Sequence, residues 1–177
     1  MSNVAPLAKI PVGVIVERSN SSSRWSDFYW RAVGVLAGQP ETPAWTKLSD
    51  DGERVTFYAG EAEIELYRTE TPYYRNNLVS GSPALWVALR QTDADPPYSV
   101  AVVTADPAEG ESLTETATDL IEQVPMPAAI QDLVAAFIAE HHVEQPFTKR
   151  KRDRADPEAM ARREPAANKD RANKDRE

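Results

Sequence analysis

The sequence predicts an α+β fold: a mainly antiparallel sheet or partly closed barrel of about six strands, packed by a C-terminal helix and a shorter helix. Three observations predict it. Segments with alternating apolar residues fill most of the chain before residue 104, the connections between them are polar and mostly short, and helical patterns follow only afterwards. Strands followed by helices favour α+β over a doubly wound parallel fold.

The first two strands are predicted from a period of two in the apolar residues. Residues 10–16 carry an aliphatic side chain at every second position, and Pro11 restricts the start of this strand to a sheet edge or a strand end. Residues 28–36 form the second strand. Alternation places Phe28, Trp30, Ala32, Gly34 and Leu36 on its inner face, and Tyr29, Arg31, Val33 and Val35 on its outer face.

Four more strands are expected at residues 55–58, 62–66, 85–89 and 98–103. In the segment 62–66 the apolar side chains alternate with glutamates. Ala62, Ile64 and Leu66 are expected to face the core, and Glu61, Glu63 and Glu65 to face outward as a solvated or partner-facing stripe.

Two helices are expected after the strands. A short helix should begin at about Pro107, because Asp106 is a favourable cap residue, proline fits the first turn and Glu109 completes a capping pattern. A longer helix is predicted over about 127–142, where apolar residues recur at helical spacing along one stripe. The stripe consists of Ile130, Leu133, Val134, Phe137, Ile138 and His141.

Charge and composition divide the chain into an acidic body and a basic end. Residues 149–177 carry 11 Lys and Arg against 7 Asp and Glu, whereas residues 1–148 carry 9 against 21. The segment 149–177 also contains no Leu, Ile, Val, Phe, Trp or Tyr, so it has almost nothing to bury. We therefore predict a disordered N-terminus at 1–8, a single α+β domain at 9–148 and a disordered charged tail at 149–177.

Several classes of protein are disfavoured by composition. The chain has no cysteine, which excludes disulfides, thiolate nucleophiles and cysteine-bound metal in this chain alone. Its N-terminal apolar run is too short and broken for a signal peptide or a membrane span, so we expect a cytoplasmic protein without membrane contact. An acidic body repels nucleic acid, and we expect no nucleic-acid partner for it.

No catalytic residue, metal ligand or cofactor is predicted. The sequence lacks the serine nucleophile elbow, the P-loop and the glycine-rich dinucleotide fingerprint, and its carboxylates form no recognisable catalytic pair. The two histidines, His141 and His142, are adjacent and point about 100° apart on a helix. We expect them to belong to a helix end, where the dipole favours cationic side chains, with partner contact or metal binding as alternatives.

Partner contact is the remaining signal. Four aromatic residues lie within 25–30, either as core with a packed loop or as an exposed patch of the composition found at interfaces. The segment 73–77 is similarly polar and aromatic, and is expected in a loop beside that patch. The basic run after residue 148 is either a solvated start of the tail or a handle for an acidic partner. The candidate partner-binding residues are Trp25, Tyr29, Arg31, Tyr74, Arg75, Lys149, Arg150, Lys151 and Arg152.

Several stretches of the sequence resemble one family. They are IPVGVIVER with RWSDFYWRAVGVLAG, AGEAEIELYRTET with YYRNNL, VTADPAEG, and VPMPAAI with FIAEHHVEQPFTKRKRD. In order and spacing they resemble, over about residues 9–153, uncharacterised bacterial proteins encoded beside genes for molybdenum- or tungsten-dependent formate dehydrogenase. The resemblance implies a non-enzymatic accessory protein that assists maturation or assembly by contacting formate dehydrogenase or one of its accessory proteins.

The same resemblance carries an enzymatic alternative, because some family members are labelled molybdopterin-guanine dinucleotide biosynthesis protein A. The stretch 35–39, VLAGQ, is similar to the start of the LAGG loop of those nucleotidyltransferases but departs from it at Gln39 and Pro40. Such an enzyme would need Mg²⁺ and carboxylates such as Asp50, Asp51 or Asp106. A small-ligand-binding barrel is a third alternative, since a barrel can hold a ligand without a sequence motif.

Overall fold

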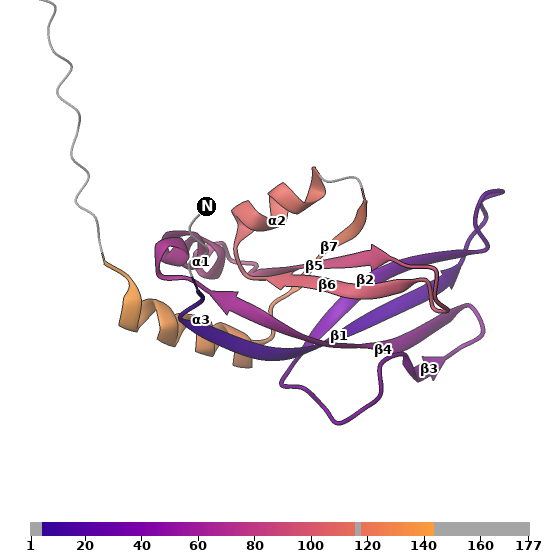
Figure 1. The fold of residues 1–177 in the computed structure, drawn as a ribbon, viewed down its shortest axis with the longest axis horizontal. Helices are drawn as coiled ribbons and strands as arrows, with labels where there is room; N and C mark the ends of the chain where they lie inside the picture. Colours follow the sequence, from indigo (N-terminus) through magenta and orange to yellow (C-terminus); the bar gives the residue numbers. More distant parts are fainter. Residues whose placement is uncertain (1–4, 116–117, 144–177) are drawn as a thin grey trace, which may run out of the picture. The chain divides into compact units, whose positions relative to one another are not determined.

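Two antiparallel sheets form the framework of residues 5–115 and 118–143, which this computed structural model describes (Figure 1). The first sheet has the order β2-β1-β4-β3, with β1 at Ala8–Asn20, β2 at Phe28–Ala37, β3 at Thr46–Asp50 and β4 at Arg54–Leu66. The second has the order β6-β5-β7, with β5 at Ala84–Gln91, β6 at Tyr98–Thr104 and β7 at Asp119–Pro125. All five strand pairs are antiparallel, which confirms the predicted fold class.

The two sheets approach each other along β4 and β6 and along β2 and β7, but no ladder of hydrogen bonds joins them. They therefore form an open pair of sheets and not a closed barrel. The space between them is filled by aliphatic side chains from both sheets. The fully buried ones include Val12, Val14, Val16, Ile64, Leu66, Leu85, Val87 and Leu89.

Strand β1 lies inside its sheet although it contains a proline near its start. The carbonyl of Pro11 accepts a hydrogen bond from the N–H of Gly38, just past the last residue of β2. In an antiparallel ladder the N and C=O of one residue point to the same side, so the nitrogen of Pro11 faces the end of β2, where no ladder bond is lost. The predicted restriction of Pro11 to a strand end holds locally. The strand itself begins at Ala8, one residue before the predicted start of the domain.

Irregularities in the strand pairing account for two differences between the structure and the prediction. The strands expected at 55–58 and 62–66 form one strand, β4, because Gly60, with φ of 138°, lies at a bulge in the pairing with β1 and not in a turn. A second register shift, opposite β1, makes Val33 an extra residue in β2. Beyond it the faces exchange, so Val35 is buried and Leu36 is 44% exposed, and the inward orientation expected for Leu36 is wrong.

Three α-helices accompany the sheets: α1 at Thr71–Val79, α2 at Pro107–Thr114 and α3 at Ala128–His141, with a 3-10 turn, η1, at Arg68–Glu70. Helices α2 and α3 confirm the two predicted helices. Asp106 caps α2 by accepting a hydrogen bond from the N–H of Ala108 at 2.8 Å. Helix α1 was expected to be a loop. Its helical pattern was missed because two of its three buried residues, Thr71 and Asn77, are polar, and only Tyr74 has a large, mostly apolar side chain.

Helices α1 and α3 pack together and fix one end of the core. The ring of Tyr74 meets that of Phe137 edge-on at 6.3 Å between centroids. Asn77 ties α1 to two adjacent strands of the second sheet, at the start of β5 and just past the end of β6. Its amide donates to the carbonyls of Ala84 and Ala105 and accepts from the N–H of Ala84. No helix of the described residues is long and apolar enough to cross a membrane. The predicted tail at 149–177 lies outside those residues.

Candidate partner-binding surface

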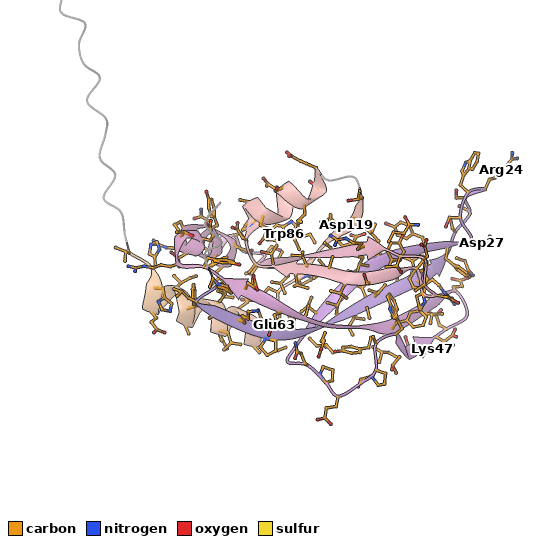
Figure 2. The ribbon with its side chains drawn as sticks, viewed as in Figure 1. Arg24, Asp27, Lys47, Glu63, Trp86 and Asp119 are labelled. Atoms are coloured by element: carbon orange, nitrogen blue, oxygen red, sulfur yellow. The ribbon has the colours of Figure 1, made fainter. Side chains whose placement is uncertain are left out.

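The hairpin of β1 and β2 extends beyond the rest of the sheets. Its connection, 21–27, is held by short-range hydrogen bonds: the N–H of Ser21 to the carbonyl of Asp27, the N–H of Ser23 to Oγ of Ser21, and the N–H of Trp25 to Oγ of Ser23. These bonds are the turn chemistry expected of a serine cluster. Figure 2 shows Arg24 at the outer end of this hairpin, away from the helices.

Large apolar side chains are exposed on this hairpin. Trp25 is 95% exposed, Tyr29 53% and Phe28 39%. An almost fully exposed tryptophan loses the stabilisation that its burial would give, and Trp, Tyr and Arg are the residues that dominate binding energy at interfaces. We call Arg24, Trp25, Phe28, Tyr29 and Arg31 the hairpin surface.

The hairpin surface is connected to the core through Arg18. The guanidinium of Arg18 lies 4.3 Å from the ring centroid of Phe28, and 5.8 and 5.7 Å from those of Trp30 and Phe57. Cation–π contacts of this kind stabilise by about 0.5–1 kcal/mol when exposed and more when desolvated. Behind Arg18, Trp30 stacks on Phe57 at 5.9 Å and meets Trp45 edge-on at 5.9 Å. Phe28 is therefore connected, through Arg18, to a packed aromatic cluster beneath the hairpin.

A polar depression of about 510 Å³ adjoins the hairpin surface on the outer face of the first sheet. Arg31 and Glu17 form an ion pair there: Nη2 and Nε of Arg31 lie 3.1 and 3.2 Å from Oε1 of Glu17. The side chain of Glu17 is 14% exposed, so the pair orients Arg31 more firmly than a fully solvated pair would. The depression is lined by Glu17, Ser19, Asn20, Tyr29, Arg31, Glu53 and Arg54.

Comparison with protein families gives a match over most of this chain. A family model described as a protein of unknown function, DUF3305, matches residues 11–151. The chain belongs to this family. The comparison finds no matching curated protein and no matching solved structure.

In this DUF3305 member the predicted partner-binding residues fall in different places. Trp25, Tyr29 and Arg31 lie together on the hairpin. Arg75 is exposed on α1, which is a helix and not the expected loop beside the aromatic patch. Lys149, Arg150, Lys151 and Arg152 lie outside the described residues.

Tyr74 belongs to the core of this DUF3305 chain, and we remove it from the candidate surface. It is 1% exposed, and its hydroxyl accepts a hydrogen bond from the N–H of Tyr67 at 3.1 Å. Burial raises the pKa of Tyr74 well above its ordinary value. Sequence reasoning grouped Tyr74 with its neighbour Tyr73, and the helical spacing of α1 separates them: Tyr73 is 44% exposed.

Phe28 and Arg24 were missed as members of the hairpin surface. Phe28 was assigned to the inner face by alternation, yet its ring is partly exposed under Arg18. The available signal was the position of Phe28 at the first residue of a strand, next to the serine turn. Arg24 sits beside Trp25 in the connection itself.

The two histidines of the DUF3305 chain occupy the end of α3, as the sequence predicted. His141 is the last helical residue and its ring lies 4.6 Å from that of Phe137. His142 follows as the C-cap and does not point away from the protein, because its Nδ1 is 3.0 Å from Oγ1 of Thr71 on α1. Residues 5–115 and 118–143 contain no group of three or more His, Asp or Glu side chains that could hold a metal ion.

The carboxylates considered for a nucleotide site serve turns and caps. Asp50 accepts from Nζ of Lys47 and the N–H of Gly52, and these bonds lower its pKa, with Lys47 the larger cause. Asp51 accepts from the N–H groups of Arg54 and Glu53 in the same β3–β4 turn, which lowers its pKa too. Asp106 caps α2, where burial raises its pKa.

Proposed function

We propose that this DUF3305 member is a non-enzymatic accessory protein that acts by protein–protein contact through the hairpin surface. The observation that carries the proposal is the nearly complete exposure of Trp25 on a hairpin whose turn is hydrogen-bonded and whose base is packed. The hydrogen-bonded turn holds the backbone that carries Trp25, so a partner that covers the ring orders less of the chain than it would on an unbonded loop. Arg24, Tyr29 and Arg31 would supply the polar and cationic contacts around it.

The proposed partner is formate dehydrogenase or one of its accessory proteins, and the proposed role is maturation or assembly of that enzyme. This part of the proposal is supported by the resemblance of residues 9–153 to proteins encoded beside formate dehydrogenase genes. The stretch RWSDFYWRAVGVLAG, which carries that resemblance, also contains all five residues of the hairpin surface.

The nucleotidyltransferase alternative is less well supported by the geometry. Phosphates bind well at helix N-termini, where several backbone N–H groups converge. In this chain the VLAGQ stretch ends β2 and continues through residues 38–45 into the strand β3, so no helix follows it. The barrel alternative would place a ligand between the sheets, where packed aliphatic side chains lie.

Gene deletion with complementation tests the proposal. In the organism that encodes the chain, removal of the gene should lower formate oxidation in cell extracts and the molybdenum or tungsten content of the purified dehydrogenase. A plasmid with the native gene should restore both. The variant Trp25→Ala should restore them poorly, whereas Leu48→Ala, which removes another exposed large apolar side chain from β3, should restore them fully.

Two results would contradict the proposal. Normal formate oxidation and normal metal content after deletion would remove the role in formate dehydrogenase maturation. Full restoration by Trp25→Ala, at the same protein level as the native chain, would remove the hairpin surface as the site of contact.

A further inference from the structure

Arg18 occupies a position of β1 that faces the core. It comes two residues after Val16, the last of three fully buried valines along that face of the strand. Its neighbours across the two ladders are Trp30 on β2 and Val55 on β4. Arginine is seldom found on a core-facing strand position. Arg18 therefore lies on the inner face of the first sheet, at the base of the projecting hairpin, where an apolar side chain would be expected.

Three aromatic rings surround the guanidinium of Arg18. Its Cζ lies 4.3 Å from the ring centroid of Phe28, and 5.8 and 5.7 Å from those of Trp30 and Phe57. Tyr98 of β6 extends this cluster, with its ring centroid 6.0 Å from that of Trp30. A ring face attracts a cation, but it offers no lone pair to the N–H donors of a guanidinium. The rings therefore position Arg18 without satisfying its hydrogen-bond donors.

No described residue satisfies those donors either. Within the part of the chain that the structure describes, the side chain of Arg18 makes cation–π contacts but no hydrogen bond and no ion pair. The pKa of Asp50 is lowered, first by Lys47 and in smaller part by Arg18, but both oxygens of this carboxylate already accept, from Lys47 and Gly52. No buried side-chain nitrogen of the described residues lacks a hydrogen-bond partner, so the unbonded N–H groups of Arg18 reach the surface.

The hairpin is also a basic segment within an acidic body. Residues 18–31 carry three Arg against one Asp, whereas residues 1–148 carry 9 Lys and Arg against 21 Asp and Glu. Arg31 is neutralised by its ion pair with a glutamate of β1, but neither Arg18 nor Arg24 forms an ion pair with a described residue. Positive charge is therefore available at the base of the hairpin and at its outer end, where Figure 2 labels Arg24.

We propose that Arg18 and the rings around it bind a carboxylate of the partner protein, an aspartate or glutamate side chain that lies next to an apolar one. This inference rests on the proposed function, since it names the chemistry that the hairpin surface recognises. A guanidinium pairs with a carboxylate through two parallel hydrogen bonds, and such a pair is stronger where neighbouring side chains exclude water. The apolar neighbour packs on the exposed parts of Trp25 and Phe28, and so keeps water away from the charge pair.

Other occupants fit Arg18 less well. A basic segment would bring like charge against Arg18 and Arg24. A nucleic-acid strand could stack on Trp25, but the phosphates beyond Arg18 would face an acidic body. A purely apolar segment would cover the guanidinium donors without replacing the water that they bind. A carboxylate beside an apolar side chain satisfies the cation and the rings together.

Titration of the full-length chain with capped peptides tests this inference. The probe is the pentapeptide glycine-phenylalanine-glutamate-phenylalanine-glycine, acetylated and amidated so that the glutamate carries its only charge. Binding is followed by the NMR signals of the Arg18 Nε–H and the Trp30 indole N–H. We expect saturable binding that shifts both signals, with an affinity in about the millimolar range for so small a probe. The twin peptide with glutamine at its centre has nearly the same shape and should bind about fivefold more weakly.

Matched variants separate Arg18 from the general charge of the hairpin. Arg18→Gln should weaken binding of the glutamate peptide about fivefold and remove the difference between the two peptides. Arg24→Gln removes the same charge from the outer end of the hairpin and should change binding by less than about twofold. Arg18→Lys keeps the charge without the planar fork, and its affinity should fall between those of the native chain and Arg18→Gln. Dispersed backbone amide signals establish that each variant is folded.

The results that overturn this inference differ from those that overturn the proposed function. The inference is wrong if the native chain binds both peptides equally, if folded Arg18→Gln and Arg18→Lys bind the glutamate peptide as the native chain does, or if Arg24→Gln weakens binding as much as Arg18→Gln. It is also wrong if phenylpropionate or a single-stranded thymidine oligonucleotide shifts the Arg18 signal at about tenfold lower concentration than the peptide, because the occupant would then be a small carboxylate or a nucleic acid. Selective binding of the glutamate peptide through Arg18, together with normal formate oxidation after gene deletion, would support this inference and contradict the role in formate dehydrogenase maturation alone.

Discussion

The indole of Trp86 lies directly against the Cα of Gly110, so that a Cβ added at Gly110 would overlap the ring. Trp86 stands on β5 and Gly110 on α2, and the contact sets how closely α2 approaches the second sheet (Figure 2 labels Trp86). Gly110 is the buried residue of α2. The glycine is thus required by a close approach and not by a turn.

Gly110→Ala should lower the free energy of unfolding by about 2 kcal/mol. Alanine would favour the helix by about 1 kcal/mol, but overpacking against a rigid indole costs about 1–3 kcal/mol and the backbone must also shift. Gly34→Ala is the control, because a Cβ there meets nothing within 4 Å, and its stability should be unchanged or slightly higher. Urea unfolding of the two variants measures the difference, and equal stability would show that α2 can move away without cost.

Asn77→Ala should destabilise the protein by at least about 3 kcal/mol. The substitution leaves the carbonyls of Ala84 and Ala105 and the N–H of Ala84 without their partner in a buried site, and each unsatisfied group costs about 1–3 kcal/mol. Asn76→Ala, one position along the same helix and exposed, should be neutral or slightly stabilising. Thermal and urea unfolding compare them. A loss below about 1 kcal/mol for Asn77→Ala would mean that water replaces the amide.

The buried carboxyl of Asp106 should make the free energy of unfolding fall as the pH rises above the ordinary pKa of an aspartate. Burial raises the pKa of the folded carboxyl, so its favourable contribution is complete below the unfolded pKa of about 3.9 and is lost as pH rises through the folded value. Asp106→Asn keeps the cap without the charge. The free energy of unfolding of the native chain, minus that of this variant, should therefore decrease as the pH rises above about 4. A difference that increases with pH would reverse the sign of the argument.

Substitution of the two tryptophans of the hairpin should have very different effects on the free energy of unfolding. Trp25→Ala should change the free energy of unfolding by less than about 0.5 kcal/mol, because the side chain is 95% exposed. Trp30→Ala should lower it by about 3 kcal/mol, since it removes the ring that contacts Trp45, Phe57 and Tyr98. Chemical unfolding followed by circular dichroism reports both. A large loss with Trp25→Ala would place that residue in the folded core.

Strong periodic signals carried the prediction of the fold. The alternation in 10–16 and 62–66 and the helical stripe of α3 are local patterns enforced by burial, and each gave an element of the right type. Strand β7 was missed because Val124 is the one residue in it that is fully buried, so no alternation is visible. The bulges at Ala59 and Val33 depend on the partner strand, and a single strand's sequence does not specify where its partner gains or loses a residue.

The candidate surface was partly predictable for the same reason. Alternation correctly turned Tyr29 and Arg31 outward, since both precede the bulge in β2. The exposure of Trp25 was left open, because composition alone does not separate a packed loop from a projecting hairpin. The depression between β4 and β6 is a tertiary feature. The glutamate stripe at 61–65 that lines it was visible in the sequence, but its position depends on β3 beginning only at Thr46, opposite Tyr58, and on the approach of β6.

Calorimetric titration of purified formate dehydrogenase, without its metal cofactor and from the organism that encodes this chain, tests the central claim most directly. The account predicts saturable binding by the native chain, at least tenfold weaker binding by Trp25→Ala, as expected for an interface anchor, and unchanged binding by Leu48→Ala. Absence of binding by the native chain, or equal binding by native and Trp25→Ala proteins of equal stability, would contradict it.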